Sequence, residues 1–246
     1  MELLKYTAMM SAKRILDNQE IFANNIANAS TIGFKSILIS PIILSNNISE
    51  KDNEKVLKKY FDPTPGVFRH TQRPLDIAII NQNGWLEIKT KKNNLAYTKN
   101  GNLQINSKRE LTSLGNIVIG KNGPIIIPEH KNIKVLSDGT IKIVRNNNNV
   151  DETIDKIKLV NIDFKDLNYK NGGLYFFEKS NLYSKNIKNC SNIKILSETL
   201  EDSNVNVSEN IIKIIEDSRK FDIQMKILHN CDENTQLINK FLNINN

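Results

Sequence analysis

The chain has few of the residues that hold disulfide-stabilised or metal-binding domains together. Its 246 residues include two cysteines, Cys190 and Cys231, which are too few for a disulfide framework and which we expect to be unpaired thiols. The three histidines, His70, His130 and His229, show no metal-ligand spacing. Glycine is also scarce, and no glycine-rich phosphate-binding loop is present. We therefore expect no metal centre and no cofactor.

Long apolar runs are absent as well. The longest, near residues 37–44, contains Ser40 and Pro41 and is far shorter than the roughly 20 residues that cross a bilayer. Glu2 near the start and the lack of a sustained apolar segment do not fit a cleaved secretory signal. We expect no membrane insertion, and any export should use a route that leaves the N-terminus intact.

Charge is plentiful and mixed. The net charge of +7 arises from 34 lysine and arginine residues against 27 acidic ones, and the lysines are dispersed among the acids. Nucleic-acid-binding proteins concentrate basic residues on one face and often interleave aromatics. A basic nucleic-acid-binding protein therefore stays a remote alternative, and we expect no nucleic-acid partner. Because no catalytic constellation of side chains is evident, we also expect that the chain is not an enzyme.

The N-terminal region shows helical periodicity. Apolar and small residues recur at spacings of three and four along one stripe, formed by Leu4, Ala8, Ser11, Ile15, Asn18, Phe22, Asn25 and Ala29. The pattern predicts a helix over residues 3–34 within an N-terminal segment at 1–35. Gly33 would end it in a left-handed conformation, and Phe34 would fold back on the last turn.

The C-terminal region predicts a second, longer helix over residues 207–242. Asn206 is a good N-cap, and Glu209 three residues later fits a capping box. Apolar residues then recur with a period of seven, at Ile214, Phe221, Leu228, Thr235 and Leu242. We expect the segment 200–246 to form a coiled-coil-like axial domain with the N-terminal helix.

The middle of the chain contains two segments with different sequence patterns. Residues 36–72 are polar and poorly periodic, so we predict an extended connector. Residues 73–199 show short alternating segments separated by turn residues, and Asn100-Gly101 predicts a hairpin between strands at 96–98 and 103–105. The fold class is therefore α+β, with terminal helices around a central antiparallel, barrel- or sandwich-like β-rich domain.

Several of these segments resemble one protein family. NNIANASTIGFK at residues 24–35 is similar to the N-terminal signature of the flagellar axial proteins, the rod and hook subunits of the bacterial flagellum. LEDSNV at 200–205 and RKFDIQMKI at 219–227 resemble the C-terminal signature, although Asp202 stands where relatives often have glycine. RPLDIAI at 73–79 and YTKNGNL at 97–103 resemble the family's β-domain.

The resemblance implies a structural subunit of the basal-body rod, best matched to the proximal rod, with a distal-rod or hook-type axial subunit as the alternative. It implies partnership with copies of itself, with other rod subunits and with the flagellar type III export apparatus. It also implies a place in the periplasm-spanning rod, where the subunit would transmit torque. The expected subunit-interface residues are Leu4, Ala8, Ile15, Phe22, Asn24, Asn25, Asn28, Gly33, Phe34, Ile211, Ile214, Phe221, Met225, Leu228, Ile238 and Leu242.

Overall fold

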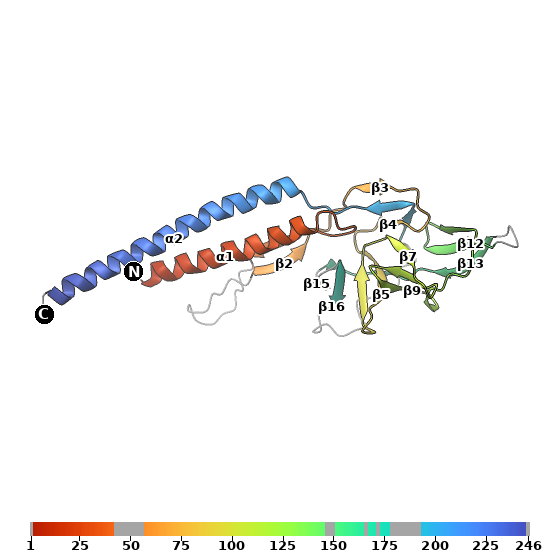
Figure 1. Ribbon diagram of the computed structural model, residues 1–246, viewed down its shortest axis with the longest axis horizontal. Coiled ribbons are helices and arrows are strands. Elements are labelled where there is room, and N and C mark those ends of the chain that lie inside the picture. The colour runs from red at the N-terminus through yellow and green to blue at the C-terminus, as the bar shows by residue number, and fades with distance from the viewer. Residues whose placement is uncertain are drawn as a thin grey trace. The chain divides into compact units, whose positions relative to one another are not determined.

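A computed structural model describes residues 2–41, 57–145, 151–164, 167–170, 173–177 and 193–244 (Figure 1). The helices of the described residues are α1 (Glu2–Ala27) and α2 (Val207–Ile244). The strands of the described residues are β1 (Ile37–Pro41), β2 (Leu57–Phe61), β3 (Phe68–His70), β4 (Ile77–Ile79), β5 (Gly84–Lys89), β6 (Leu95–Thr98), β7 (Leu103–Ile105), β8 (Leu111–Ser113), β9 (Asn116–Gly120), β10 (Gly123–Pro124), β11 (Asn132–Val135), β12 (Thr140–Val144), β13 (Asp151–Lys156), β14 (Leu159–Asn161), β15 (Leu167–Lys170), β16 (Leu174–Phe177), β17 (Ile195–Ser197) and β18 (Thr199–Glu201).

The chain divides into two compact units. The helical unit comprises Met1–Ala27, Ile37–Lys58 and Asn206–Asn246, and the β unit comprises Asn28–Ser36 and Lys59–Val205. The predicted α+β class, with terminal helices and a central antiparallel β-rich region, is confirmed. Within the described residues, no helix combines the length and the hydrophobicity that a membrane crossing requires.

Helix α1 ends at Ala27, well before the predicted end near residue 34. Asn25 lies in the last turn of α1, and its side chain forms hydrogen bonds with the backbone of Ile37, the first residue of β1. Beyond Ala27 the chain forms a turn in which the Thr31 N–H donates to the Asn28 carbonyl at 3.0 Å. Asparagine side chains compete with helical backbone bonds, so this asparagine-rich segment favours a turn over further helix.

Helix α2 begins where the sequence predicts. The Asn206 Oδ1 accepts a hydrogen bond from the Glu209 N–H at 3.2 Å, which confirms Asn206 as the N-cap. The Glu209 carboxylate lies in the first turn, where it complements the positive end of the helix dipole, and it also pairs with Lys213 at 2.5 Å.

Replacing Asn206 by alanine is expected to destabilise the helical unit by about 1 kcal/mol, since one donor at the start of α2 loses its acceptor. Thermal unfolding followed by circular dichroism at the helical band measures the change. Asn206→Ser keeps a capping oxygen and should retain most of the stability. Equal stability of the alanine variant and the native chain would show that the cap contributes nothing.

In the helical unit, α1 and α2 lie side by side and run antiparallel (Figure 1). Three contacts mark their register. The Lys5 ammonium pairs with Asp232 at 2.6 Å, and Gln19 Nε2 donates to Ser218 Oγ at 3.3 Å. The Lys213 ammonium lies 5.8 Å from the ring centroid of Phe22. We call the contact face between the two helices the seam.

In the β unit, every described strand pair is antiparallel. The largest sheet has nine strands in the order β15-β16-β6-β5-β9-β8-β7, with β10 added to β9 and β14 to β5. Strands β11, β12 and β13 form a second sheet. Strands β17 and β18 return from the far end of the chain to pair with β4 and β3. The β unit therefore needs residues from both ends of the chain.

The core of the β unit is built from alternating aliphatic residues of these strands, and the chain's single tryptophan lies beside it. Trp85 on β5 is fully buried, and its indole N–H donates to the Ile162 carbonyl at 3.0 Å. Its ring contacts Tyr175 and Phe164 at centroid separations of 4.7 and 5.0 Å. Burial of this indole makes its fluorescence a direct reporter of the folding of the β unit.

The predicted hairpin at Asn100-Gly101 is wrong. Strand β6 pairs with β5 and β16, whereas β7 pairs with β8. The residues between them cross over β4: the Ile77 N–H donates to the Gly101 carbonyl at 3.0 Å, and Asp76 bridges to Asn102. A side chain at Gly101 would meet the Ile77 carbonyl oxygen at 1.6 Å, so this glycine permits a close crossing and not a tight turn.

Candidate functional site

The helical unit exposes large apolar side chains on faces outside the seam. Met9 and Leu16 lie seven residues apart on α1 and are 55% and 51% exposed. On α2, Ile212 and Ile223 are 56% and 55% exposed. At about 100° per residue these positions of α2 fall on the side roughly opposite its most buried residues. We call this set the outer face: Met9, Leu16, Ile211, Ile212, Ile215 and Ile223.

The predicted interface residues of the two helices fall into three groups. Leu4, Ile211, Met225 and Ile238 are exposed, and Ala8 and Ile15 are buried. Half-buried positions are Phe22, Ile214, Phe221 and Leu228. The side chain of Leu242 lies outside the described residues. The heptad positions of α2 therefore border the seam and keep part of their surface free of their own chain.

The asparagines of the N-terminal motif have roles within the chain. Asn25 is 1% exposed, and its amide both donates to the Ile37 carbonyl and accepts from the Ile37 N–H, each at 2.9 Å. Asn28 is half-buried and accepts from the Tyr169 hydroxyl at 3.3 Å. Asn24 is half-buried. The structure thus brings Asn25 to β1 and Asn28 to β15.

Gly33 and Phe34 are also buried in their own chain. Gly33 has a φ of 70°, and a Cβ there would lie 2.5 Å from the carbonyl carbon of Lys99. The Gly33 N–H donates to the Glu201 carbonyl at 2.8 Å. Phe34 has no exposed surface and meets the Tyr169 ring edge-on, with centroids 5.4 Å apart. The left-handed conformation predicted for Gly33 is confirmed, although it serves a close backbone approach and not the end of a helix.

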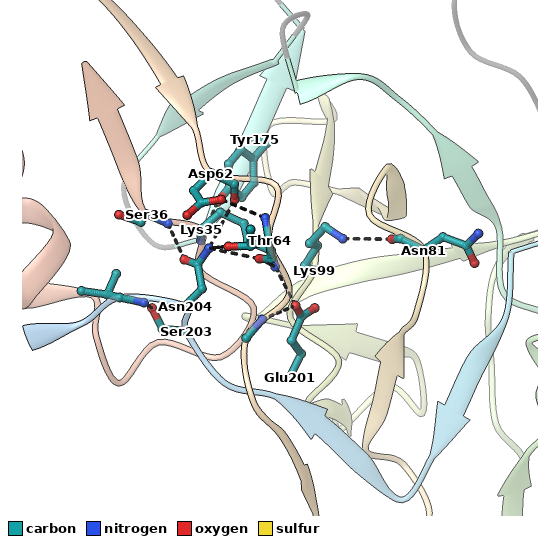
Figure 2. Close-up of polar contacts among 12 residues, drawn as sticks. Lys35, Ser36, Asp62, Thr64, Asn81, Lys99, Tyr175, Glu201, Ser203 and Asn204 are labelled. Carbon is teal, nitrogen blue, oxygen red and sulfur yellow. Dashed lines mark hydrogen bonds and ion pairs between the residues drawn. The ribbon is translucent and has the colours of Figure 1, made fainter. Parts of the chain in front are cut away.

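Lys35 and Glu201 join the two terminal motifs inside the β unit (Figure 2). The Lys35 ammonium pairs with Glu201 Oε1 at 2.6 Å and donates to the Thr64 carbonyl at 2.7 Å. Both side chains are 2% exposed. Glu201 Oε1 also accepts from the Gly66 N–H at 3.0 Å. We call the region around Lys35, Thr64, Glu201 and Asn204 the motif junction.

Asn204 completes the motif junction (Figure 2). Its Oδ1 accepts from the Ser36 N–H at 2.7 Å, and its Nδ2 donates to the carbonyls of Thr64 and Asp62 at 3.1 and 3.3 Å. One asparagine therefore holds the segment after the N-terminal motif, the segment before β3, and the start of the C-terminal motif. Such a multiply bonded amide fixes the relative positions of three distant stretches of the chain.

Lys99 adds a second buried cation near the motif junction. Its ammonium donates to the Asn81 carbonyl at 3.2 Å and lies 5.3 Å from the centroid of the Trp85 ring. Burial lowers the pKa of Lys99 from 10.5 to about 7; the Glu201 carboxylate opposes this shift, and Lys35 reinforces it. Burial also raises the pKa of the Tyr175 hydroxyl, which accepts from the Lys35 backbone N–H at 3.4 Å.

The sequence interpretation did not select Lys35, Lys99 or Glu201, although all three lie in segments that resemble the flagellar family. The signal available in the sequence was a charged residue directly after an apolar one. Lys35 follows Phe34, and Glu201 follows Leu200, and both apolar residues are buried. The motif junction is held by hydrogen bonds and an ion pair among its own side chains and backbone groups. Its arrangement is suited to holding the two terminal motifs together.

Comparison with protein-family models gives three matches along the chain. Residues 6–35 match the model described as flagella basal body rod protein. Residues 79–143 match the flagellar hook protein FlgE/F/G D1 domain, and residues 196–241 match the flagellar basal body rod FlgEFG protein C-terminal model. The first and last matches include the motifs that meet at the motif junction.

Curated relatives match over the whole chain. The flagellar basal-body rod protein FlgF of Buchnera aphidicola subsp. Baizongia pistaciae is 45% identical over 100% of both chains. FlgF of Salmonella typhimurium is 32% identical over 97% of this chain and 98% of its own. The rod protein FlgG of Buchnera aphidicola subsp. Acyrthosiphon pisum is 25% identical over 91% and 93%. The chain therefore belongs to the flagellar basal-body rod proteins and is a structural subunit of the rod.

Proposed function

We propose that the chain joins the rod through the outer face of α1 and α2. Large apolar side chains that are exposed in the isolated chain are typical of protein interaction sites, because a partner would remove them from water. Met9 and Leu16 on α1, and Ile212 and Ile223 on α2, are such side chains of the helical unit. The half-buried residues Ile214, Phe221 and Leu228 lie along the seam, on the other side of α2.

The proposed contact is heterologous, with the outer face of one subunit meeting a different surface of the next. A two-fold symmetric contact would close as a dimer, whereas a heterologous contact that does not close builds a helical assembly. We propose that copies of the chain and neighbouring rod subunits meet in this way. On this proposal α1 and α2 form a coiled-coil-like axial domain, supported by the seven-residue spacing of the predicted seam residues.

The proposed role is mechanical and requires no catalytic residue. The assembled helices would transmit torque along the periplasm-spanning rod, and the flagellar type III apparatus would export the chain, both supported by its membership of the rod family. The branched nine-stranded sheet of the β unit supports a barrel- or sandwich-like domain. The dispersed positive charge favours no second function.

Ile223→Asp and Met9→Asp are each expected to abolish incorporation of the chain into the rod. Each places a charge in a surface that assembly would desolvate, and an uncompensated buried charge is strongly unfavourable. The measurement is the amount of each variant recovered in purified basal bodies when it replaces the native chain. Fluorescence of Trp85 and the helical circular dichroism should be unchanged in the isolated variants.

Thr7→Asp is the matched control, because it adds the same charge to an exposed position on the side of α1 opposite Met9 and Leu16, without removing an apolar side chain. It should be recovered in basal bodies at the native level. Native recovery of both Ile223→Asp and Met9→Asp would exclude the outer face as the assembly surface.

A further inference from the structure

Strand β17 lies between two other segments of the β unit. On one side it pairs with β4 in antiparallel register. On the other side its Ile195 N–H donates to the carbonyl of Ser137, just beyond the end of β11, at 2.9 Å. Its Ser197 hydroxyl donates to the carbonyl of Val135, the last residue of β11. Strand β4, strand β17 and the end of β11 are therefore adjacent, and alternate residues along them share one face.

This face carries exposed aliphatic side chains. The inward residues of the same segments belong to the core of the β unit: Ile77, Ile79, Ile133, Val135 and Ile195. Their outward neighbours Ile80, Leu136 and Leu196 are 46%, 38% and 38% exposed. Leu136 and Leu196 lie between the two contacts that join β17 to β11, and Ile80 is diagonal to Leu196 across the β4–β17 pair. These three residues form one apolar surface, which we call the apolar triad.

Lysines flank the apolar triad on the same face. Lys134 lies two residues before Leu136, and Lys194 lies two residues before Leu196, so strand alternation places both beside the triad. Lys142 on β12 lies opposite Lys134. These three lysines have no ion-pair partner among the described residues. We call the apolar triad together with Lys134, Lys142 and Lys194 the lysine-flanked patch.

The acidic residues of the adjoining turns are engaged elsewhere. Asp138 pairs with Lys156 at 3.4 Å, and Glu198 lies 3.9 Å from His70. The lysine-flanked patch therefore has an apolar centre and a positively charged edge. Because complementary charge favours one partner over others, the surface that fits this patch presents apolar side chains flanked by carboxylates.

The outer face of α2 has this chemistry between residues 212 and 223. Its exposed apolar residues there are Ile212, Ile215 and Ile223. Glu216 lies seven residues before Ile223, and Asp222 lies seven residues after Ile215, so both exposed carboxylates share the side of these isoleucines. Neither has an ion-pair partner among the described residues. Arg219 adds one positive charge on this side, which leaves the surface net negative.

We propose that the lysine-flanked patch receives this part of α2 from a second copy of the chain. The inference rests on the proposed function and names the surface that the outer face contacts. The two surfaces differ, so each copy offers one of them to a neighbour on either side. Such a contact is heterologous and extends into a helical assembly, as the rod requires.

Charge reversal with rescue tests the proposal. Lys134→Glu combined with Lys194→Glu should lower the recovery of the chain in purified basal bodies about tenfold, because carboxylates would then face Glu216 and Asp222. Adding Glu216→Lys and Asp222→Lys to the same chain reverses both surfaces and should restore recovery to within about twofold of the native level. Glu216→Lys with Asp222→Lys alone should be recovered as poorly as the lysine variant. Trp85 fluorescence and helical circular dichroism should be unchanged in all three isolated variants.

Disulfide trapping locates the contact directly. A chain with Leu196→Cys and Ile212→Cys, and without Cys190 and Cys231, should form disulfide-linked multimers when purified basal bodies are oxidised. Chains with only one of the two new cysteines should stay monomeric.

The outcomes separate this inference from the proposed function. Native recovery of the lysine variant would overturn the inference, and so would a lack of rescue, because the partner would then be a different protein. Monomers alone after oxidation would also overturn it. If these results came with poor recovery of Ile223→Asp and Met9→Asp, the outer face would remain the assembly surface and only its partner would be wrong.

Discussion

Glu201→Gln is expected to lower the free energy of unfolding of the β unit by about 3 to 5 kcal/mol. The substitution keeps the size of the side chain but removes the negative charge, and it leaves the Lys35 ammonium buried without a counterion. This is the usual magnitude for breaking one side of a buried ion pair. Urea unfolding followed by the fluorescence of Trp85 measures the change, because this tryptophan lies in the same unit.

A double-mutant cycle separates the pair from the packing around it. Lys35→Met alone leaves the Glu201 carboxylate buried without its cation and should be destabilising by a similar amount. Lys35→Met combined with Glu201→Gln should lose far less stability than the sum of the two single variants, since no uncompensated charge remains. Additive losses, or a loss below about 1 kcal/mol for Glu201→Gln, would show that the two charges are not coupled.

Lys99→Met is expected to stabilise the β unit at neutral pH. The folded protein holds the pKa of Lys99 at about 7, whereas the unfolded chain has the ordinary value of 10.5. Between these two values the unfolded chain binds the extra proton, so the contribution of Lys99 to the free energy of unfolding rises with pH by up to about 1.4 kcal/mol per unit. At pH 7 the accumulated penalty is on the order of 4 kcal/mol.

The variant and the native chain should therefore differ in a pH-dependent way. The stability difference should be largest and constant below pH 7, and it should shrink as the pH rises from about 7 to about 10.5. Near pH 10.5 the native chain should be at least as stable, because it keeps the hydrogen bond to Asn81. Urea titrations at several pH values give the difference directly. A difference that does not vary with pH would mean that Lys99 titrates normally in the folded protein.

The sequence correctly predicted the elements that depend on interactions between residues close together in the chain. Asn206 is an N-cap because a short polar side chain before an apolar periodic run satisfies free backbone donors, and α2 begins at the next residue. Trp85 lies in a strand because the segment around it is apolar and bounded by a turn. The α+β class followed from the two kinds of periodicity in the chain, which differ between its ends and its middle.

Long-range contacts determined what the patterns did not predict. Lys35 and Glu201 are 166 residues apart, so no local window contains both partners of the buried pair. Gly33 was interpreted as a helix terminator, whereas the structure requires glycine because the Lys99 backbone passes close to it. The hairpin at Asn100-Gly101 failed for the same reason, since β4 pairs with the residues that would have formed the turn. In each case a contact between residues distant in the sequence, and not the local preference, determined the structure.

The seam also shows that the spacing of apolar residues does not by itself identify the buried side chains of a helix. The heptad of Ile214, Phe221 and Leu228 predicted the face of α2 that would be buried, yet Asp217 is buried more deeply. The apolar residues of α2 extend beyond the face that its own chain covers, onto Ile212 and Ile223. One helix that offers apolar side chains on two sides needs two partners, and α1 supplies only one of them.

Thiol labelling of intact rods tests most directly whether a second partner covers the exposed apolar side chains of α2. A cysteine replacing Ile223 in a chain without Cys190 and Cys231 should react rapidly with a maleimide in the isolated protein, because the side chain is exposed. In purified basal bodies the same cysteine should react at least tenfold more slowly, since assembly would remove it from water. Equal labelling rates in the isolated protein and in the rod would contradict the account.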